Sequence, residues 1–151
     1  MTVADRLAEL GVALPPVPVP VAAYVPAVRT GDLVYTSGQL PTVAGELVVT
    51  GRVGAEVLTE DAAAAARTCA LNALAAVDAL VGLDAVRRVV KVVGFVASAP
   101  GFTDQPAVVN GASELLGAIF GEPGQHARSA VGVAELPKGA PVEVELIVEV
   151  G

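Results

Sequence analysis

The sequence has few of the residues that build disulfides and zinc sites. Its 151 residues include one cysteine, Cys69, and one histidine, His126. A single cysteine cannot form an intrachain disulfide, and this usage is typical of a reducing compartment, so we expect a cytoplasmic protein. One histidine without a cysteine partner provides no zinc site of the usual spacing. No G-x-G-x-x-G or G-x-x-x-x-G-K-[ST] segment marks a nucleotide site, and we expect neither a metal nor a cofactor.

Charge is also scarce. Charged residues make up 17% of the chain, against about 25% in an average soluble domain. Since a monomer needs a polar surface, this shortage indicates that part of the surface is buried in a homo-oligomer. The net charge is −7, and the nine basic residues are scattered, apart from Arg87, Arg88 and Lys91. Because phosphate backbones are bound by clustered Lys and Arg, we expect no nucleic-acid partner.

We expect no membrane anchor. The longest uncharged stretch, residues 10–28, is close to spanning length, but it contains five prolines. Prolines in the interior break a helix, so this stretch is a poor transmembrane candidate. The N-terminus has no basic region of the kind that begins a signal peptide, since Arg6 lies between Asp5 and Glu9. We therefore expect a soluble protein with no membrane partner.

The hydrophobic pattern predicts an α+β protein in two parts. Residues 1–23 are expected to form a short helix and a proline-rich arm, and residues 24–151 a single α+β domain. The expected elements of that domain are a hairpin of strands 32–37 and 46–49, a helix ending at Gly82, a strand 86–97, a helix 104–120, and strands 127–134 and 142–150. The economical packing is a single mixed β-sheet with the two long helices on one face, leaving the other face for subunit contacts. Cys69 lies on the apolar side of the first long helix, where we expect a buried, inert thiol, and His126 is interpreted as a loop residue.

The final strand alternates between apolar residues and a second set that begins with Glu143. In the preceding strand the same rule assigns Val131 to the core and Arg128 and Ala130 to the other face. We therefore expect Arg128 on the same face as the glutamates, with Ala130 leaving room for a ligand. An arginine can bind a small carboxylate bidentately, and a glutamate can hold a water and pass its proton. In the simpler interpretation, Arg128 only relieves repulsion among the glutamates; counting the strands as a hairpin implies no direct contact with Glu143.

Several segments of the chain resemble the RidA (YjgF) family. They are T-S-G-Q-L-P at residues 36–41, A-R-S-A-V at 127–131, L-P-K at 136–138, V-E-V-E at 142–145, V-V-N at 108–110 and Y-V at 24–25. Together they cover the chain from about residue 24 to residue 150. The resemblance implies a chorismate-mutase-like fold and a homotrimer with ligand sites in the clefts between subunits. It also implies cofactor-free hydrolysis of 2-imino or enamine acids, such as 2-aminoacrylate, to 2-keto acids and ammonia.

The resemblance assigns roles to individual residues. Arg128 would hold the substrate carboxylate and Glu143 would orient or activate the water, while four residues would line the cleft: Tyr24, Ser37, Asn110 and Ala130. Two positions depart from the family pattern, since Ala130 stands where well-known members have cysteine and His126 where proline is common. These departures favour an alternative function, a non-catalytic trimer that binds small carboxylate metabolites. Endoribonuclease activity, a third possibility in the family, is disfavoured by the acidic charge.

Overall fold

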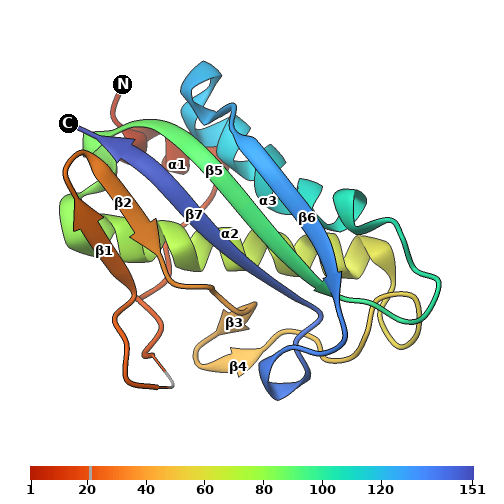
Figure 1. The fold of residues 1–151 in the computed structure, drawn as a ribbon. Coiled ribbons are helices and arrows are strands. Elements are labelled where there is room, and N and C mark those ends of the chain that lie inside the picture. The colour runs from red at the N-terminus through yellow and green to blue at the C-terminus, as the bar shows by residue number, and fades with distance from the viewer. Residues whose placement is uncertain (21) are drawn as a thin grey trace.

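Five strands form one mixed sheet, and two long helices cover one of its faces (Figure 1). The computed structural model describes residues 1–20 and 22–151. In spatial order the strands are β1 (Ala27–Thr30), β2 (Leu33–Thr36), β7 (Val142–Val150), β5 (Val86–Ala97) and β6 (Ala127–Val133). The strands β5 and β6 run parallel, and the other neighbours are antiparallel. The predicted fold class is therefore confirmed.

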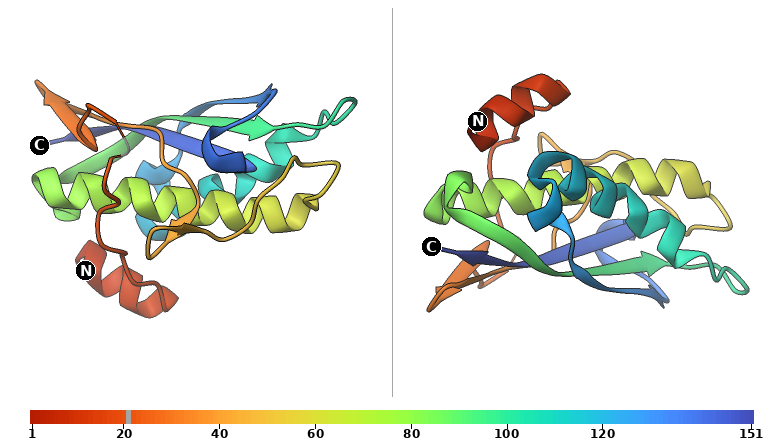
Figure 2. Two further views of the ribbon diagram at one scale, coloured as in Figure 1. Left: turned by 90° about the horizontal axis from the view of Figure 1, so that it is seen from below. Right: turned by 90° about the horizontal axis from the view of Figure 1, so that it is seen from above.

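The helices form a layer on one side of the sheet (Figure 2). This layer consists of α2 (Thr59–Val81) and α3 (Gln105–Phe120), and the short α1 (Val3–Leu10) packs outside it against α3. The two long helices approach closely because Gly111 of α3 has no side chain, and a Cβ there would overlap the carbonyl of Ala63. Within the described residues, α2 is long and apolar enough to span a membrane, but 56% of its apolar window is buried in the fold. Its apolarity is thus accounted for by the core.

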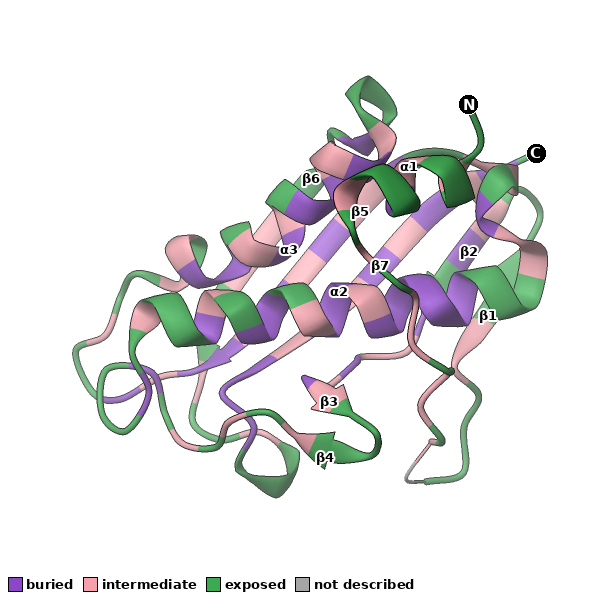
Figure 3. Ribbon diagram, turned by 180° about the vertical axis from the view of Figure 1, so that it is seen from behind, coloured by how far each residue is buried: buried purple, intermediate pink, exposed green. Residues whose placement is uncertain are grey.

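The strand β7 divides the sheet into a buried face and an open face. Its apolar residues lie under the helices, each at most 1% exposed: Val142, Val144, Leu146, Val148 and Val150. The alternate residues, beginning with Glu143, are half-buried on the face that carries no helix. Figure 3 shows this alternation of buried and intermediate residues along β5 and β7. The faces predicted for the final strand are confirmed.

The predicted N-terminal hairpin was wrong in its pairing. The strand β2 pairs with β1 across the two-residue turn at Gly31 and Asp32, and not with residues 46–49. The turn at Ala44 and Gly45 instead joins β3 (Thr42–Val43) to β4 (Glu46–Leu47) in a separate two-stranded sheet. Both turn residues have positive φ, 53° and 84°, which suits a tight two-residue hairpin. Two adjacent hairpins thus replace the single predicted one.

The predicted faces of the strand at 127–134 were also wrong. Since β5 lies between β6 and β7, the two final strands do not form a hairpin. Val131 is 44% exposed on the open face, whereas Ala130 packs against the core cluster. The reason is that β6 is an edge strand. Its covered side meets α3 and side chains such as Gln105, which lies over Gly132, so that side takes small or polar residues.

Candidate functional site

The six residues that the sequence singles out fall into two separate groups. The first consists of Arg128, Asn110 and Ala130, on β6 and the helix α3 that covers it. The second consists of Glu143, Ser37 and Tyr24, near the start of β7 and the end of β2.

The first group is organised around the Arg128 guanidinium. Its Nη1 donates hydrogen bonds to the Asn110 side-chain oxygen at 2.8 Å and to the Ser113 hydroxyl at 3.2 Å. Asn110 and Ser113 are three residues apart on α3, so their side chains lie on the same side of the helix. Both acceptors are neutral, and among residues 1–20 and 22–151 no carboxylate oxygen lies within 4.0 Å of Arg128. The cation is therefore held in place without being neutralised.

Sequence reasoning missed two neighbours of Arg128. The Ser113 hydroxyl lies 2.8 Å from Nε2 of His126, which the sequence placed in a loop without a role. The other ring nitrogen, Nδ1, lies 2.6 Å from the carbonyl oxygen of Gly124. The helical spacing of Asn110 and Ser113 was a usable signal for Ser113. No local pattern pointed to His126, which precedes β6 and meets α3 only through the fold.

Ala130 does not open space for a ligand above the sheet, as its small side chain had indicated. It lies opposite Gly94 in the ladder between β6 and β5, and it packs on the helix-covered side. A Cβ on the neighbouring Gly132 would meet the side chains of Gln105 and Ser98. The space over these small residues is therefore occupied by the protein itself.

The second group is organised around the Glu143 carboxylate. Glu143 lies opposite Phe95 on the open face, and its carboxylate lies against Gly38 at the place that a Cβ would occupy. Burial raises the pKa of Glu143 above its usual 4.5, and the negative charge of Glu145 raises it further. A carboxyl with a raised pKa changes protonation more readily near neutral pH, as proton transfer requires.

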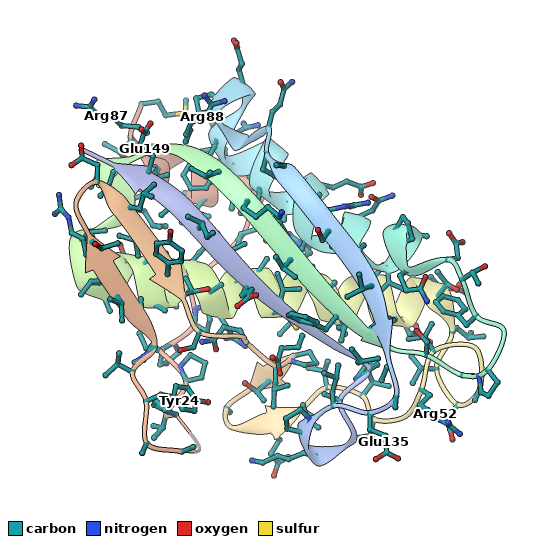
Figure 4. All side chains as sticks on the ribbon, viewed as in Figure 1. Tyr24, Arg52, Arg87, Arg88, Glu135 and Glu149 are labelled. Carbon is teal, nitrogen blue, oxygen red and sulfur yellow. The ribbon has the colours of Figure 1, made fainter. Side chains whose placement is uncertain are left out.

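Ser37 directly precedes Gly38, which lies against this carboxylate, and Tyr24 lies in the loop next to Ser37. The Ser37 hydroxyl donates to the carbonyl oxygen of Val25 at 2.6 Å, so it anchors the loop that carries Tyr24. Figure 4 shows Tyr24 in that loop, below β1 and at the end of the sheet opposite Arg87, Arg88 and Glu149. Tyr24 is 46% exposed. Together with Gly38 and the proline-rich residues 15–20, it lines a cavity of about 530 Å³.

Arg128 and Glu143 are too far apart within one chain to hold the same small molecule. Arg128 pairs with Val92, on the helix-covered side, whereas Glu143 pairs with Phe95, on the open side. This register separates the two backbones by about 10 Å along the strands and about 10 Å across them. The prediction that Arg128 shares a face with the glutamates is wrong. Arg128 and Glu143 make no direct contact, as expected, but the reason is that β5 lies between their strands and not the predicted hairpin.

Other reactive residues add no second centre in the described part of the chain. Within residues 1–20 and 22–151, no three His, Cys, Asp or Glu side chains are grouped closely enough to hold a metal ion. Cys69 is fully buried, and burial raises the pKa of its thiol well above the usual value. The prediction of a buried thiol is confirmed, and this burial keeps Cys69 protonated.

The mixed sheet with one helical layer, a partly buried arginine and a partly buried glutamate are the features of a small α+β protein. Residues 16–150 match the family model described as Endoribonuclease L-PSP. The chain belongs to this family, which is the RidA/YjgF family. The resemblance drawn from the short motifs is thereby confirmed.

Individual relatives span nearly the whole chain. It is 48% identical to Protein TCP17 of Trypanosoma cruzi over 97% of this chain and 93% of that protein. It is 37% identical to the 2-iminobutanoate/2-iminopropanoate deaminase of Dermatophagoides farinae over 91% of this chain and 93% of the relative. The crystal structure of the YjgF gene product of E. coli is similar with a TM-score of 0.67 and 32% identity, over 90% and 93% of the two chains.

Proposed function

We propose that this protein hydrolyses 2-imino acids and their enamine tautomers, such as 2-aminoacrylate, to 2-keto acids and ammonia. The observation that carries the proposal is the Glu143 carboxylate, which is desolvated, has a raised pKa and lies against Gly38. The name of the mite relative supports the reaction class, because it describes a deaminase of two small imino acids. The proposed substrates are small carboxylates, which match the uncompensated cation at Arg128.

Arg128 would bind the substrate carboxylate. The two N–H groups of Nη1 donate to Asn110 and Ser113, and the remaining three N–H groups are two on Nη2 and one on Nε. These three groups form a fork that suits bidentate contact with a carboxylate. The substrate would thus be oriented by its carboxylate, with the neighbouring imine carbon in a fixed position.

Glu143 would act on the water and on the leaving nitrogen. The ionised carboxylate accepts a proton from water as the water oxygen attacks the carbon of the protonated imine, which gives a neutral carbinolamine and protonated Glu143. Glu143 then returns this proton to the amine nitrogen. As the C–N bond breaks, the carboxylate takes the hydroxyl proton of the carbinolamine, and the keto acid forms. The released ammonia carries that last proton away as ammonium. The imine carbon is already electrophilic, so this sequence requires only positioning and proton transfer.

A second copy of the chain would complete the site. One chain holds Arg128 and Glu143 on opposite sides of its sheet, about 10 Å apart in each direction. The open face also carries three exposed apolar side chains, Val28, Tyr35 and Val131, which are 53%, 43% and 44% exposed. Packing the open face of one chain against the β6 edge of the next would bury this apolar surface. We therefore propose a homotrimer in which Arg128 of one chain faces Glu143 of the next, in agreement with the low content of charge.

Two observations leave room for another function at the same site. His126 and Ala130 depart from the family pattern, which favours a trimer that binds small carboxylates without converting them. The description of the matched family names an endoribonuclease. The net charge of −7 and the scattered basic residues argue against binding of a phosphate backbone.

The test measures ammonia and keto-acid release from 2-aminoacrylate generated in situ by a serine or cysteine lyase. The wild type should accelerate release, and Glu143→Gln should reduce the rate by about 100-fold or more through loss of the proton carrier. Arg128→Ala should abolish binding of the carboxylate. Binding of pyruvate, measured by calorimetry, should survive in Glu143→Gln and disappear in Arg128→Ala. Pyruvate binding without acceleration in the wild type would favour the non-catalytic trimer, and cleavage of RNA that persists in Arg128→Ala would contradict both.

A further inference from the structure

The hydrogen bonds around Arg128 continue past its direct partners. The Ser113 hydroxyl, which accepts a hydrogen bond from Arg128 at 3.2 Å, lies 2.8 Å from Nε2 of His126. Nδ1 of the same ring lies 2.6 Å from the carbonyl oxygen of Gly124. The three side chains come from β6, α3 and the segment before β6, so only the folded chain brings them together.

The carbonyl oxygen of Gly124, together with a neutral imidazole, determines the direction of each hydrogen bond in this series. A carbonyl only accepts, so Nδ1 of His126 must carry the proton. The Nε2 atom of the neutral ring is then an acceptor, and the Ser113 hydroxyl donates to it. Because the Ser113 hydroxyl donates its proton to His126, its oxygen can only accept the hydrogen bond from Nη1 of Arg128. The hydrogen bonds therefore all run in one direction, from Arg128 through Ser113 and His126 to the carbonyl oxygen of Gly124.

The end of this chain of bonds is rigidly placed. Gly124 is buried in a 3₁₀ turn, Glu122–Gly124, and a Cβ there would overlap the backbone of Leu116 and Gly117 in α3. His126 and Ser113 are both half-buried. The carbonyl is thus fixed against the same helix that carries Ser113, and the imidazole is held between the two.

We propose that Ser113 and His126 are positioning residues that fix the rotation of the Arg128 guanidinium. With Nη1 held by Asn110 and by this directed hydroxyl, the edge formed by Nε and Nη2 remains free for the substrate carboxylate. Without His126, the Ser113 hydroxyl is free to rotate and donate to the backbone of its own helix, a common alternative for serine. The proposal rests on the proposed role of Arg128 as the carboxylate anchor.

The direct test is ¹⁵N NMR of the Arg128 guanidinium in the full-length protein. In the wild type, Nη1 and Nη2 should give separate signals, because the hydrogen bonds on Nη1 slow rotation about the Nε–Cζ bond. Ser113→Ala and His126→Leu should merge the two signals. Ser113→Thr and His126→Gln, which retain a hydroxyl and an acceptor oxygen, should keep them apart. Separate signals in both Ser113→Ala and His126→Leu would overturn the proposal, whatever the activity of these variants.

The functional test is the binding of pyruvate and the kinetics with 2-aminoacrylate. Ser113→Ala and His126→Leu should weaken pyruvate binding and raise KM about tenfold, as expected for loss of one hydrogen bond. The kcat should change much less, because the lost contact holds substrate and transition state alike. Ser113→Thr and His126→Gln should restore KM. Unchanged KM in Ser113→Ala beside a large increase in Arg128→Ala would overturn the positioning role and leave the proposed function standing. If Arg128→Ala changes neither binding nor KM, the proposed function itself has failed, and this proposal fails with it.

Discussion

Arg128 and Glu143 have opposite surroundings. Arg128 donates to two neutral oxygens at 2.8 and 3.2 Å, and no carboxylate of the described residues 1–20 and 22–151 lies within 4.0 Å of it. Glu143 lies beside a second carboxylate, Glu145, and burial raises its pKa. The first environment stabilises a fixed cation that can bind an anion, whereas the second makes a charge costly and a proton easy to exchange. The proposed function accordingly assigns carboxylate binding and proton transfer to separate regions of one small fold.

The largest expected effect comes from placing a charged side chain on the buried side of β7. Val144 is fully buried under the helices, whereas its neighbours Glu143 and Glu145 are on the open face. Val144→Asp buries a charge with no partner, and the loss should be about 4 kcal/mol or more, enough to unfold the chain. The measurement is thermal unfolding followed by circular dichroism. The matched control, Glu145→Asp, should remain folded; a folded Val144→Asp would mean that the buried face tolerates charge.

A smaller effect is expected from moving the Glu143 carboxylate without changing its chemistry. A Cβ at Gly38 would overlap that carboxylate, while the backbone there lies outside the positive-φ region. Gly38→Ala should therefore leave the fold intact and reduce deamination by about tenfold or more through misplacement. The control is Gly117→Ala, since a Cβ at Gly117 meets no atom within 4 Å. Wild-type activity in Gly38→Ala would show that the position of the carboxylate against Gly38 is unimportant.

The parts of the fold that follow a strong period could be predicted from the sequence. The helix at Thr59–Val81 and the strand at Val142–Val150 have long, regular patterns, and both agree with the structure. The pairing of β1 with β2 could not be predicted, because the strands have only four residues each and two turn signals compete. The faces of β6 could not be predicted either. An edge strand under a polar part of α3 reverses the usual relation between hydrophobicity and burial.

The candidate site was predictable as a set of residues but not as an arrangement. Short motifs singled out Arg128 and Glu143, and their roles remain predictions. Their separation depends on β5 lying between β6 and β7, which is a property of the topology and not of any local pattern. His126 was missed for the same reason, since its partner Ser113 lies 13 residues earlier on a different element.

The smallest expected effect concerns the charge beside Glu143. Burial is the main cause of its raised pKa, and Glu145 is the second cause, so Glu145→Gln should lower that pKa without returning it to 4.5. The proposed reaction requires the ionised carboxylate, so its rate should fall as pH drops through the pKa of Glu143. The acidic limb of kcat/KM should move to lower pH in Glu145→Gln. Glu149→Gln, on the same face of the same strand, is the matched control and should leave the limb in place.

The raised pKa of Glu143 should also make the free energy of unfolding depend on pH. A carboxyl whose pKa is higher in the folded state binds its proton more tightly there, so stability is lost as pH rises from about 4.5 through the folded pKa. Removing the Glu145 charge lowers the folded-state pKa of Glu143, which narrows the pH range over which stability is lost. Glu145→Gln should therefore lose less stability than the wild type between acid and neutral pH. Thermal unfolding across this range, with Glu149→Gln beside it, measures the difference. An acidic limb that stays in place while the stability curve moves would mean that Glu143 is buried as inferred, but that another group transfers the proton.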